Sequence, residues 1–87
     1  MPAEITIYGR PDCHLCDEAR AEIRQLAAEV EPFRFDEVDI DSDDGLLATY
    51  LERIPVVEID GEIVSELVLD SDAVRDALRR PGARWVP

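Results

Sequence analysis

Residues 8–16 read Tyr-Gly-Arg-Pro-Asp-Cys-His-Leu-Cys, and this stretch decides the fold that we expect for the chain. It holds Cys13 and Cys16, the only two cysteines in the sequence. They lie between an apolar run at residues 5–8, typical of a strand, and a segment with helical periodicity. A thiol pair at a strand-to-helix junction indicates a redox motif when the protein is cytosolic and the surrounding pattern is β-α-β.

The position of the pair at a helix start predicts its chemistry. If the helix begins near Cys13, its first free N–H groups point at the Cys13 sulfur, and the helix dipole favours the thiolate. Since the thiolate is the attacking species in disulfide exchange, we expect a Cys13 pKa below the free-thiol value of about 8.5. Cys16, one turn into the helix, is expected to be less exposed. The sequence thus predicts Cys13 as the nucleophile and Cys16 as the resolving thiol.

Three structural interpretations of the cysteines stay open beside the redox one. A zinc site needs four ligands, usually in two close pairs, whereas His14 is the only further Cys or His in the chain, so no metal is expected. A purely structural disulfide would close a loop of about four residues, which stabilises less than a longer loop does. The third interpretation is a pair of buried, inert cysteines, against which the placement at a helix start argues.

Length and composition indicate one domain over residues 1–87. The chain is 46% hydrophobic and 34% charged, which is ordinary for a globular protein. No apolar run reaches the length of a membrane span, and the N-terminus lacks the pattern of a signal peptide, so the cytoplasm is the expected location. A net charge of −12 argues against nucleic acid and anionic membranes as partners. Any protein partner is expected to present basic patches.

The first half of the chain predicts strand, helix and strand. Residues 4–8 form the first strand, ended by Gly9 and Pro11. A helix follows over 14–30, and a second strand begins at Phe33 and runs through Ile40, with its register unsettled by a change of phase. The apolar stripe of the helix consists of Leu15, Ala19, Ile23, Leu26, Ala27 and Val30.

The second half predicts a helix, a hairpin and a last helix. A helix over 43–52 is expected to be capped by Ser42 or Asp41 and to pack through Leu46, Leu47, Tyr50 and Leu51. Pro55 precedes a strand at 56–59, and Asp60-Gly61 predicts a two-residue hairpin to an antiparallel strand over 63–69. The last helix runs over 71–80. Its inward residues are expected to be Ala73, Val74, Ala77 and Leu78. Trp85 is expected to cover an edge of the core.

The predicted order is therefore β-α-β-α-β-β-α. A right-handed crossover makes the first two strands parallel, and the hairpin adds an antiparallel pair. The expected fold is α/β, a four-stranded mixed sheet with helices on both faces.

With these elements in place, the chain resembles a glutaredoxin-like member of the thioredoxin superfamily. It is most similar to the short bacterial glutaredoxin-like proteins that carry C-x-x-C after the first strand. The resemblance covers roughly residues 4–80, and its anchors are residues 10–16, 54–56 and 60–61.

The resemblance implies a role for each residue of the site. Cys13 would be the nucleophile and Cys16 the resolving thiol. Pro55 would be cis and lie beside the sulfurs, where the backbone of Ile54 pairs with an extended thiol substrate. Arg10 would attract a glutathione carboxylate or support the thiolate.

Two departures from the family bear on the substrate. The residue after Cys13 is His14, which favours the thiolate when protonated and does little when it is neutral and points outward. Residues 63–70 lack the Gly-Gly turn with which glutathione-binding glutaredoxins follow the hairpin. Arg53 either assists in binding or is simply solvated.

The leading hypothesis is a cytoplasmic thiol–disulfide oxidoreductase with a redox-active disulfide, serving cell redox homeostasis and electron transport. It would act as a monomer without a bound cofactor, on a disulfide-containing protein or a small thiol substrate. A reductase or a low-molecular-weight thiol, such as glutathione as co-substrate, would donate the electrons. Two alternatives are a non-catalytic thioredoxin-fold binding module and a dimer that carries an iron–sulfur cluster through Cys13 of each subunit.

Overall fold

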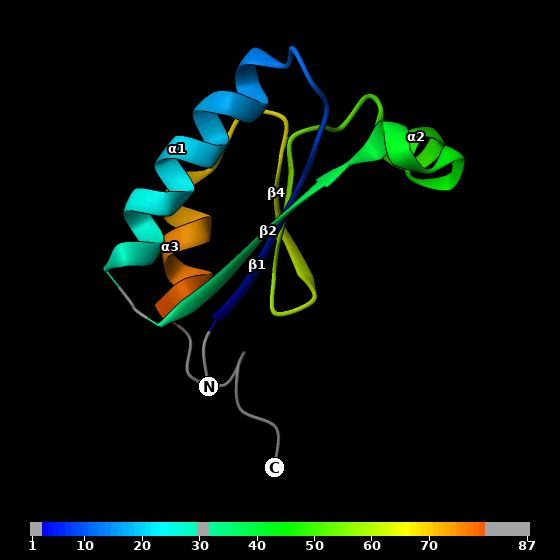
Figure 1. Cartoon of the computed structure of the whole chain (residues 1–87). Coiled ribbons are helices and arrows are strands. Elements are labelled where there is room, and N and C mark those ends of the chain that lie inside the picture. The colour runs from blue at the N-terminus through cyan, green and yellow to red at the C-terminus, as the bar shows by residue number, and fades with distance from the viewer. Residues whose placement is uncertain (1–2, 30–31, 80–87) are drawn as a thin grey trace.

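A computed structural model describes residues 3–29 and 32–79 of the 87-residue chain (Figure 1). The expected order of strands and helices is confirmed, with a short 3₁₀ helix, η1, added after the second strand. The elements are β1 (Ala3–Gly9), α1 (His14–Ala28), β2 (Phe33–Asp39), η1 (Ile40–Ser42), α2 (Asp44–Tyr50), β3 (Val56–Ile59), β4 (Glu62–Glu66) and α3 (Ser71–Arg79).

The four strands form one mixed sheet in the order β2-β1-β3-β4. β1 pairs with β2 in parallel and with β3 antiparallel, and β3 and β4 form the antiparallel hairpin. The hairpin turns at Asp60 and Gly61, whose φ angles of 53° and 85° are the left-handed values that such a turn requires. The expected α/β fold with a mixed sheet is confirmed.

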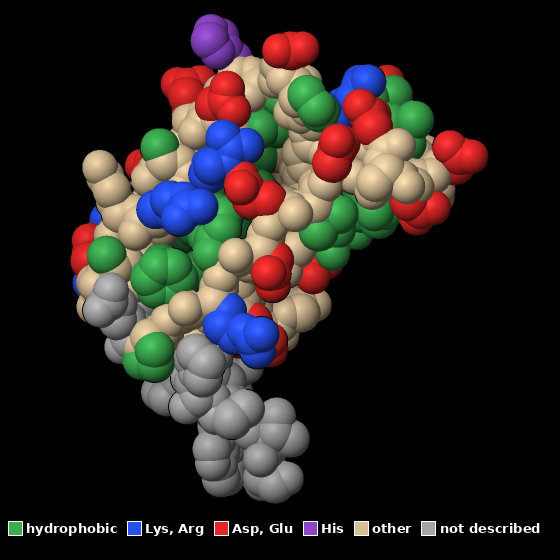
Figure 2. Space-filling view, viewed as in Figure 1, with side chains coloured by type: hydrophobic (Ala, Val, Ile, Leu, Met, Phe, Trp, Pro, Cys, Tyr) green, Lys and Arg blue, Asp and Glu red, His purple; other side chains and the backbone are tan. Residues whose placement is uncertain are grey.

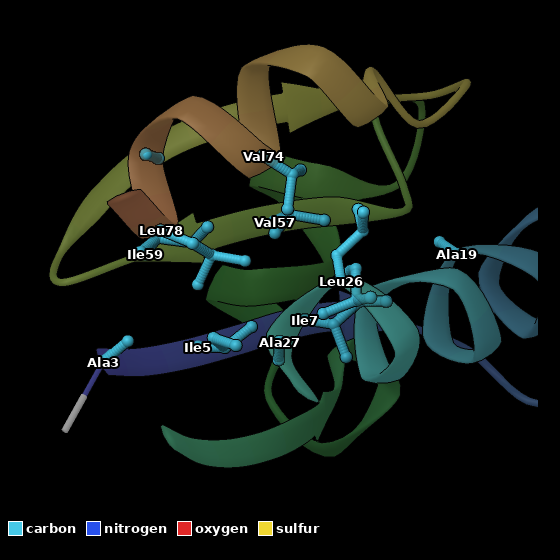
Figure 3. Packing of buried hydrophobic residues seen from close by; sticks show 12 residues of the cluster. Ala3, Ile5, Ile7, Ala19, Leu26, Ala27, Val57, Ile59, Val74 and Leu78 are labelled. Atoms are coloured by element: carbon cyan, nitrogen blue, oxygen red, sulfur yellow. The ribbon is translucent and has the colours of Figure 1, made fainter. Parts of the chain in front are cut away.

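The hydrophobic core lies between the sheet and the pair of helices α1 and α3, which cover the same face (Figures 1 and 3). Alternate residues of the inner strands point into it because side chains along a strand alternate between the two faces. The fully buried core side chains include Ile5, Ile23, Val57, Ile59, Val74 and Leu78. Burial of each large aliphatic side chain contributes about 1.5–3 kcal/mol to folding, so these residues hold α1 and α3 on the sheet.

The unsettled register of β2 is resolved by its pairing with β1. Phe33 and Phe35 pack against the core, whereas Glu37 continues on that face and pairs with Arg20 of α1. Val38 therefore points to the opposite face, next to Tyr8 in the register. The change of phase in the sequence marks the point where β2 runs beyond the core.

The opposite face of the sheet is covered at one end by α2, so helices lie on both faces as expected (Figure 1). The ring of Tyr50 stacks on that of Tyr8 with their centroids 4.8 Å apart, and the Arg53 guanidinium lies over the Tyr50 ring at 5.3 Å. The Tyr8 hydroxyl donates a hydrogen bond to Glu58 at 3.2 Å. Partial burial, followed by the nearby Glu58 carboxylate, raises the pKa of Tyr8.

Two details around η1 differ from the prediction. Ile40 is buried in η1 rather than at the end of a strand, because the Asp39 carboxylate caps a helical turn at this point. The N-cap of α2 is Asp43, whose carboxylate accepts a helix-start N–H at 3.4 Å, so the expected caps Ser42 and Asp41 are wrong.

Helix and strand ends differ as well. α2 ends at Tyr50 rather than at residue 52, and β4 starts at Glu62 and ends at Glu66 rather than at Leu69. The strand stops because Leu67 takes a left-handed φ of 61°, which turns the chain out of the sheet. Leu51, expected to pack inward, is 44% exposed, and Ala73 is half-buried.

Val30, Trp85 and the last residue of the helix expected over 71–80 lie outside the described residues. Among the described residues, no helix is both long and apolar enough to cross a membrane.

Candidate active site

The register of the sheet brings three separate segments to one end of the molecule. Tyr8 pairs with Val56, and Val56 pairs with Glu66, so the end of β1, the start of β3 and the end of β4 are neighbours. The segments that meet there are residues 10–13 after β1, residues 54–55 before β3 and residues 67–69 after β4. Figure 1 shows the start of α1 at this end. The cysteine pair and Pro55 thus lie at the same end of the sheet.

Cys13 and Cys16 form a disulfide with their Cα atoms 5.2 Å apart. Cys13 is half-buried, whereas only 2% of Cys16 is exposed. The difference in exposure is the one expected from the position of Cys16 inside the helix. Cys13 is therefore the more accessible of the two cysteines.

Cys13 is the N-cap of α1, which begins at His14. Its backbone is extended, with φ −103° and ψ 108°, and its sulfur accepts the Cys16 N–H at 3.2 Å. The Cys13 carbonyl accepts the first helical hydrogen bond, from the Asp17 N–H at 3.1 Å. The sulfur thus occupies the position where a capping oxygen normally stabilises a helix start, and the same N–H groups favour a negative charge on it once the disulfide is reduced.

Gly9 is a site residue that the sequence reasoning missed. The sequence pattern marks it only as the end of a strand, yet it packs against the Cys16 side chain from the last position of β1. A glycine at the strand end just before the cysteines is the signal that could have indicated this close approach.

Arg10 and Arg53 both lie in ion pairs. The Arg10 Nε atom is 3.0 Å from Asp41 Oδ1, and both side chains are about 40% exposed. Arg53 donates two hydrogen bonds to the Glu66 carboxylate, at 3.0 and 2.6 Å, which lower the pKa of Glu66. Arg10, which the resemblance expects to attract a glutathione carboxylate, and Arg53, for which the sequence leaves both assistance in binding and simple solvation open, are therefore each paired with a carboxylate of the chain.

The segment before β3 has the cis Ile54–Pro55 bond that the resemblance implied, and Pro55 is buried. The Ile54 N–H donates to the Tyr50 carbonyl at 3.1 Å. The Ile54 carbonyl accepts no hydrogen bond from residues 3–29 or 32–79. This carbonyl therefore remains available as an acceptor among the described residues.

The residues between the two cysteines lie on the surface. His14 is exposed, and the single histidine of the chain, purple in Figure 2, stands at the outer surface. Leu15 is 42% exposed, so its place in the inward stripe is wrong. The helix is rotated so that Cys16 faces inward in its place, and Leu15 instead faces the loop between β4 and α3.

Among the described residues, no group of three or more His, Cys, Asp or Glu side chains is arranged to hold a metal ion. The acidic side chains are spread over the surface around the start of α1 and over α2 (Figure 2).

A cysteine pair at the start of the first helix, a cis-proline before the antiparallel strand and this four-stranded sheet define a thioredoxin-fold protein with a redox-type C-x-x-C motif. The chain belongs to the Glutaredoxin-like domain family (DUF836), whose model matches residues 4–79. No curated protein matches the chain.

Solved structures agree with this assignment. Protein Ne2328 of Nitrosomonas europaea is similar with a TM-score of 0.74 and 32% identity, over 85% of this chain and 88% of that one. The X-ray structure of protein XcR50 of X. campestris is similar with a TM-score of 0.69 and 35% identity, over 85% of this chain and 93% of that one. A mutant thioredoxin of Halobacterium salinarum is similar with a TM-score of 0.61 and 26% identity, over 98% of this chain and 78% of that one. The thioredoxin fold together with the C-x-x-C pair suggests a redox function.

Proposed function

We propose that the protein is a thiol–disulfide oxidoreductase that reduces disulfides of proteins or small molecules through a mixed disulfide at Cys13. The observation that carries the proposal is the Cys13–Cys16 disulfide at the start of α1, with one sulfur partly exposed and the other buried. A purely structural cross-link would not need this difference in exposure or a helix start beneath the outer sulfur.

The reaction starts from the reduced pair. The Cys13 thiolate attacks one sulfur of the substrate disulfide, a Cys13–substrate disulfide forms, and the other substrate sulfur leaves as a thiolate that takes up a proton. Cys16 then loses its proton and attacks the Cys13 sulfur, which breaks the mixed disulfide and releases the second substrate thiol. The substrate gains two electrons, and the protein is left with the Cys13–Cys16 disulfide.

Three further residues have proposed supporting roles. The Ile54 carbonyl, beside Pro55, would accept a backbone N–H of an extended substrate. Arg10 would support the thiolate or attract a substrate carboxylate, and it would have to leave Asp41 to do the latter. His14 would add positive charge near Cys13 when it is protonated.

The cycle closes when two electrons return to the disulfide. We propose a reductase, or glutathione or another low-molecular-weight thiol, as the donor, and no bound cofactor. The protein would work as a monomer in the cytoplasm, in redox homeostasis and electron transport, because reduced thiols are maintained in that compartment.

Reduction of hydroxyethyl disulfide and of insulin by wild type, Cys13→Ser and Cys16→Ser tests the proposal. Cys13→Ser is expected to fall to the background rate with both substrates. Cys16→Ser is expected to accumulate a mixed disulfide with the substrate, seen as added mass on the intact protein. A Cys13→Ser variant that retains the wild-type rate would show that Cys13 is not the attacking thiol. Partners trapped from a cell extract on Cys16→Ser would then name the physiological substrates.

A further inference from the structure

A small hollow lies along the first two turns of α1, beside the loop that joins β4 to α3. Its volume is about 120 Å³. Its lining residues are Leu15, Glu18, Ala19, Glu22, Val68 and Leu69. Leu15 stands between Cys13 and Cys16 in the sequence, so the hollow opens within one turn of the disulfide.

The size of the hollow restricts what it can hold. Sites that enclose small molecules measure about 300–1,000 Å³. A volume of about 120 Å³ is that of one aliphatic side chain rather than of a whole tripeptide such as glutathione. The natural occupant is therefore a single side chain that belongs to a larger molecule.

Four of the six residues that line the hollow are apolar, and two of these are open to solvent. Leu15 is 42% exposed and Val68 is 72% exposed, and Leu67 next to it is 50% exposed. These are three of the five large hydrophobic side chains that are exposed among the described residues. Apolar surface gathered in this way gains from being covered by an apolar group.

The wall formed by the loop is already held in place. At the start of the loop, the Leu67 N–H donates to the Arg53 carbonyl at 3.0 Å. At its end, the Ser71 hydroxyl donates to the Glu22 carboxylate at 2.7 Å, which ties the loop to α1. Because both ends are fixed, Val68 is presented without a large cost in conformational entropy on binding.

The surroundings of the hollow carry negative charge. Glu18 and Glu22 stand at its rim, and among the described residues no cation pairs with Glu18. Asp12 and Asp17 flank the cysteines, and only Asp17 has a described basic partner, Arg20. Figure 2 shows acidic side chains around this end of the molecule. A substrate that approaches here is favoured when it is cationic, whereas the anionic glutathione disulfide is repelled.

From these observations we infer that the hollow between Leu15 and Val68 receives an apolar side chain beside the disulfide of a protein substrate whose neighbouring residues are Lys or Arg. The inference rests on the proposed function and specifies its substrate class. Cys13 attacks the disulfide, the hollow takes the adjacent apolar side chain, and the acidic rim meets the basic residues.

The test uses four disulfides and measures kcat/KM for each. Two are symmetric dimers of short peptides with Leu beside the cysteine, one with two Lys and the other with two Glu. Glutathione disulfide and hydroxyethyl disulfide are the small anionic and small neutral references. The basic dimer is expected to be reduced about tenfold faster than the acidic dimer, with the difference shrinking as salt is added.

Variants locate the effect. Val68→Ser is expected to lower the ratio of kcat/KM for the basic dimer to that for hydroxyethyl disulfide by about tenfold, the lower range for loss of an apolar contact in a pocket. Leu51→Gln changes a leucine that is 44% exposed and lies directly after α2, away from the hollow, and it is expected to leave the ratio unchanged.

The outcomes separate the two levels of the proposal. Equal rates on the basic and acidic dimers, or an unchanged ratio in Val68→Ser, would overturn the inference while reduction of hydroxyethyl disulfide still supports the oxidoreductase. Failure of the wild type to reduce any of the four would overturn the proposed function itself.

Discussion

Gly9 and Cys16 lie in direct contact across the end of the sheet. A Cβ atom on Gly9 would stand 3.0 Å from the Cys16 sulfur and 3.2 Å from its Cβ atom, closer than ordinary van der Waals contact. The absence of a side chain at residue 9 is therefore what leaves room for the inner sulfur.

Gly9→Ala is expected to destabilise the oxidised protein by about 1–3 kcal/mol, because the added methyl group forces Cys16 or the strand to shift in a tightly packed region. Urea denaturation measures the difference in the free energy of unfolding. The matched control is Gly45→Ala in α2, where the new Cβ would meet the Asp43 carboxylate at an ordinary 3.5 Å. The control is expected to retain stability, since alanine favours a helix. Equal stabilities for Gly9→Ala and wild type would show that the space beside Cys16 accommodates an added methyl group.

The Cys13 thiol is expected to titrate well below the free-thiol value of about 8.5. Its sulfur lies at the N-cap of α1 and accepts the Cys16 N–H, and both favour the thiolate. Thiolate absorbance of the reduced Cys16→Ser variant, followed against pH, gives the pKa directly. An unshifted value would mean that Asp12, Asp17 and Glu18 cancel the effect of the helix start.

The sequence was sufficient to predict the parts of the site that depend on local pattern. The C-x-x-C pair, the strand before it and the helix after it follow one another within the chain, so Cys13 could be placed at the N-cap. Pro55 before the third strand and Asp60-Gly61 at the hairpin are likewise strong local signals. These features, together with a right-handed crossover, were enough for the order and direction of the strands.

What could not be predicted depends on contacts between distant segments. Leu15 fits the apolar stripe by spacing alone, but the sheet selects Cys16 for the interior. The role of Gly9 becomes visible only when β1 and α1 are packed together. The hollow beside Val68 exists because the loop after β4 is tied to α1, more than 40 residues earlier in the chain.

Replacing Glu66 is expected to release Arg53 for anionic substrates. Glu66→Gln removes the charged partner that receives two hydrogen bonds from Arg53. The ratio of kcat/KM for glutathione disulfide to that for hydroxyethyl disulfide is then expected to rise by roughly threefold at low salt, because the unpaired charge of Arg53 speeds the association of an anionic substrate. Glu52→Gln, with the same change in net charge, is the control. An equal rise in the control would assign the effect to net charge rather than to Arg53.

The same ion pair predicts a pH dependence of stability. Hydrogen bonds from Arg53 lower the Glu66 pKa in the folded state below its ordinary value of 4.5. The folded protein therefore releases this proton more readily than the unfolded chain. The contribution of the Arg53–Glu66 pair to the free energy of unfolding is therefore present above about pH 4.5, and it is lost as the pH falls through the lowered Glu66 pKa. Urea midpoints of wild type and Glu66→Gln, measured from pH 3 to 7, are expected to differ above that window and to converge below it.

Leu67→Gly is expected to stabilise the protein by up to about 1 kcal/mol. A left-handed backbone costs a residue with a side chain roughly 1–2 kcal/mol, and glycine avoids this while adding about 0.5–1 kcal/mol of conformational entropy to the unfolded state. Leu67 has a φ of 61°, and half of its side chain is exposed, so the lost packing of the buried half offsets part of this gain. Thermal or urea denaturation gives the sign, and a loss of more than 1 kcal/mol would show that the Leu67 side chain is needed for the fold.

The central place of β1 has a consequence for synthesis of the chain. Ala3 pairs with Phe33, 30 positions later, and Ile5 pairs with Ile59, 54 positions later. An isolated helix of 15 residues such as α1 is only marginally stable in water, so it depends on that sheet. We therefore expect Cys13 of a growing polypeptide to remain an ordinary, weakly acidic thiol until β3 has left the ribosome, so that the reactivity of this one sulfur reports whether the sheet beneath α1 has formed.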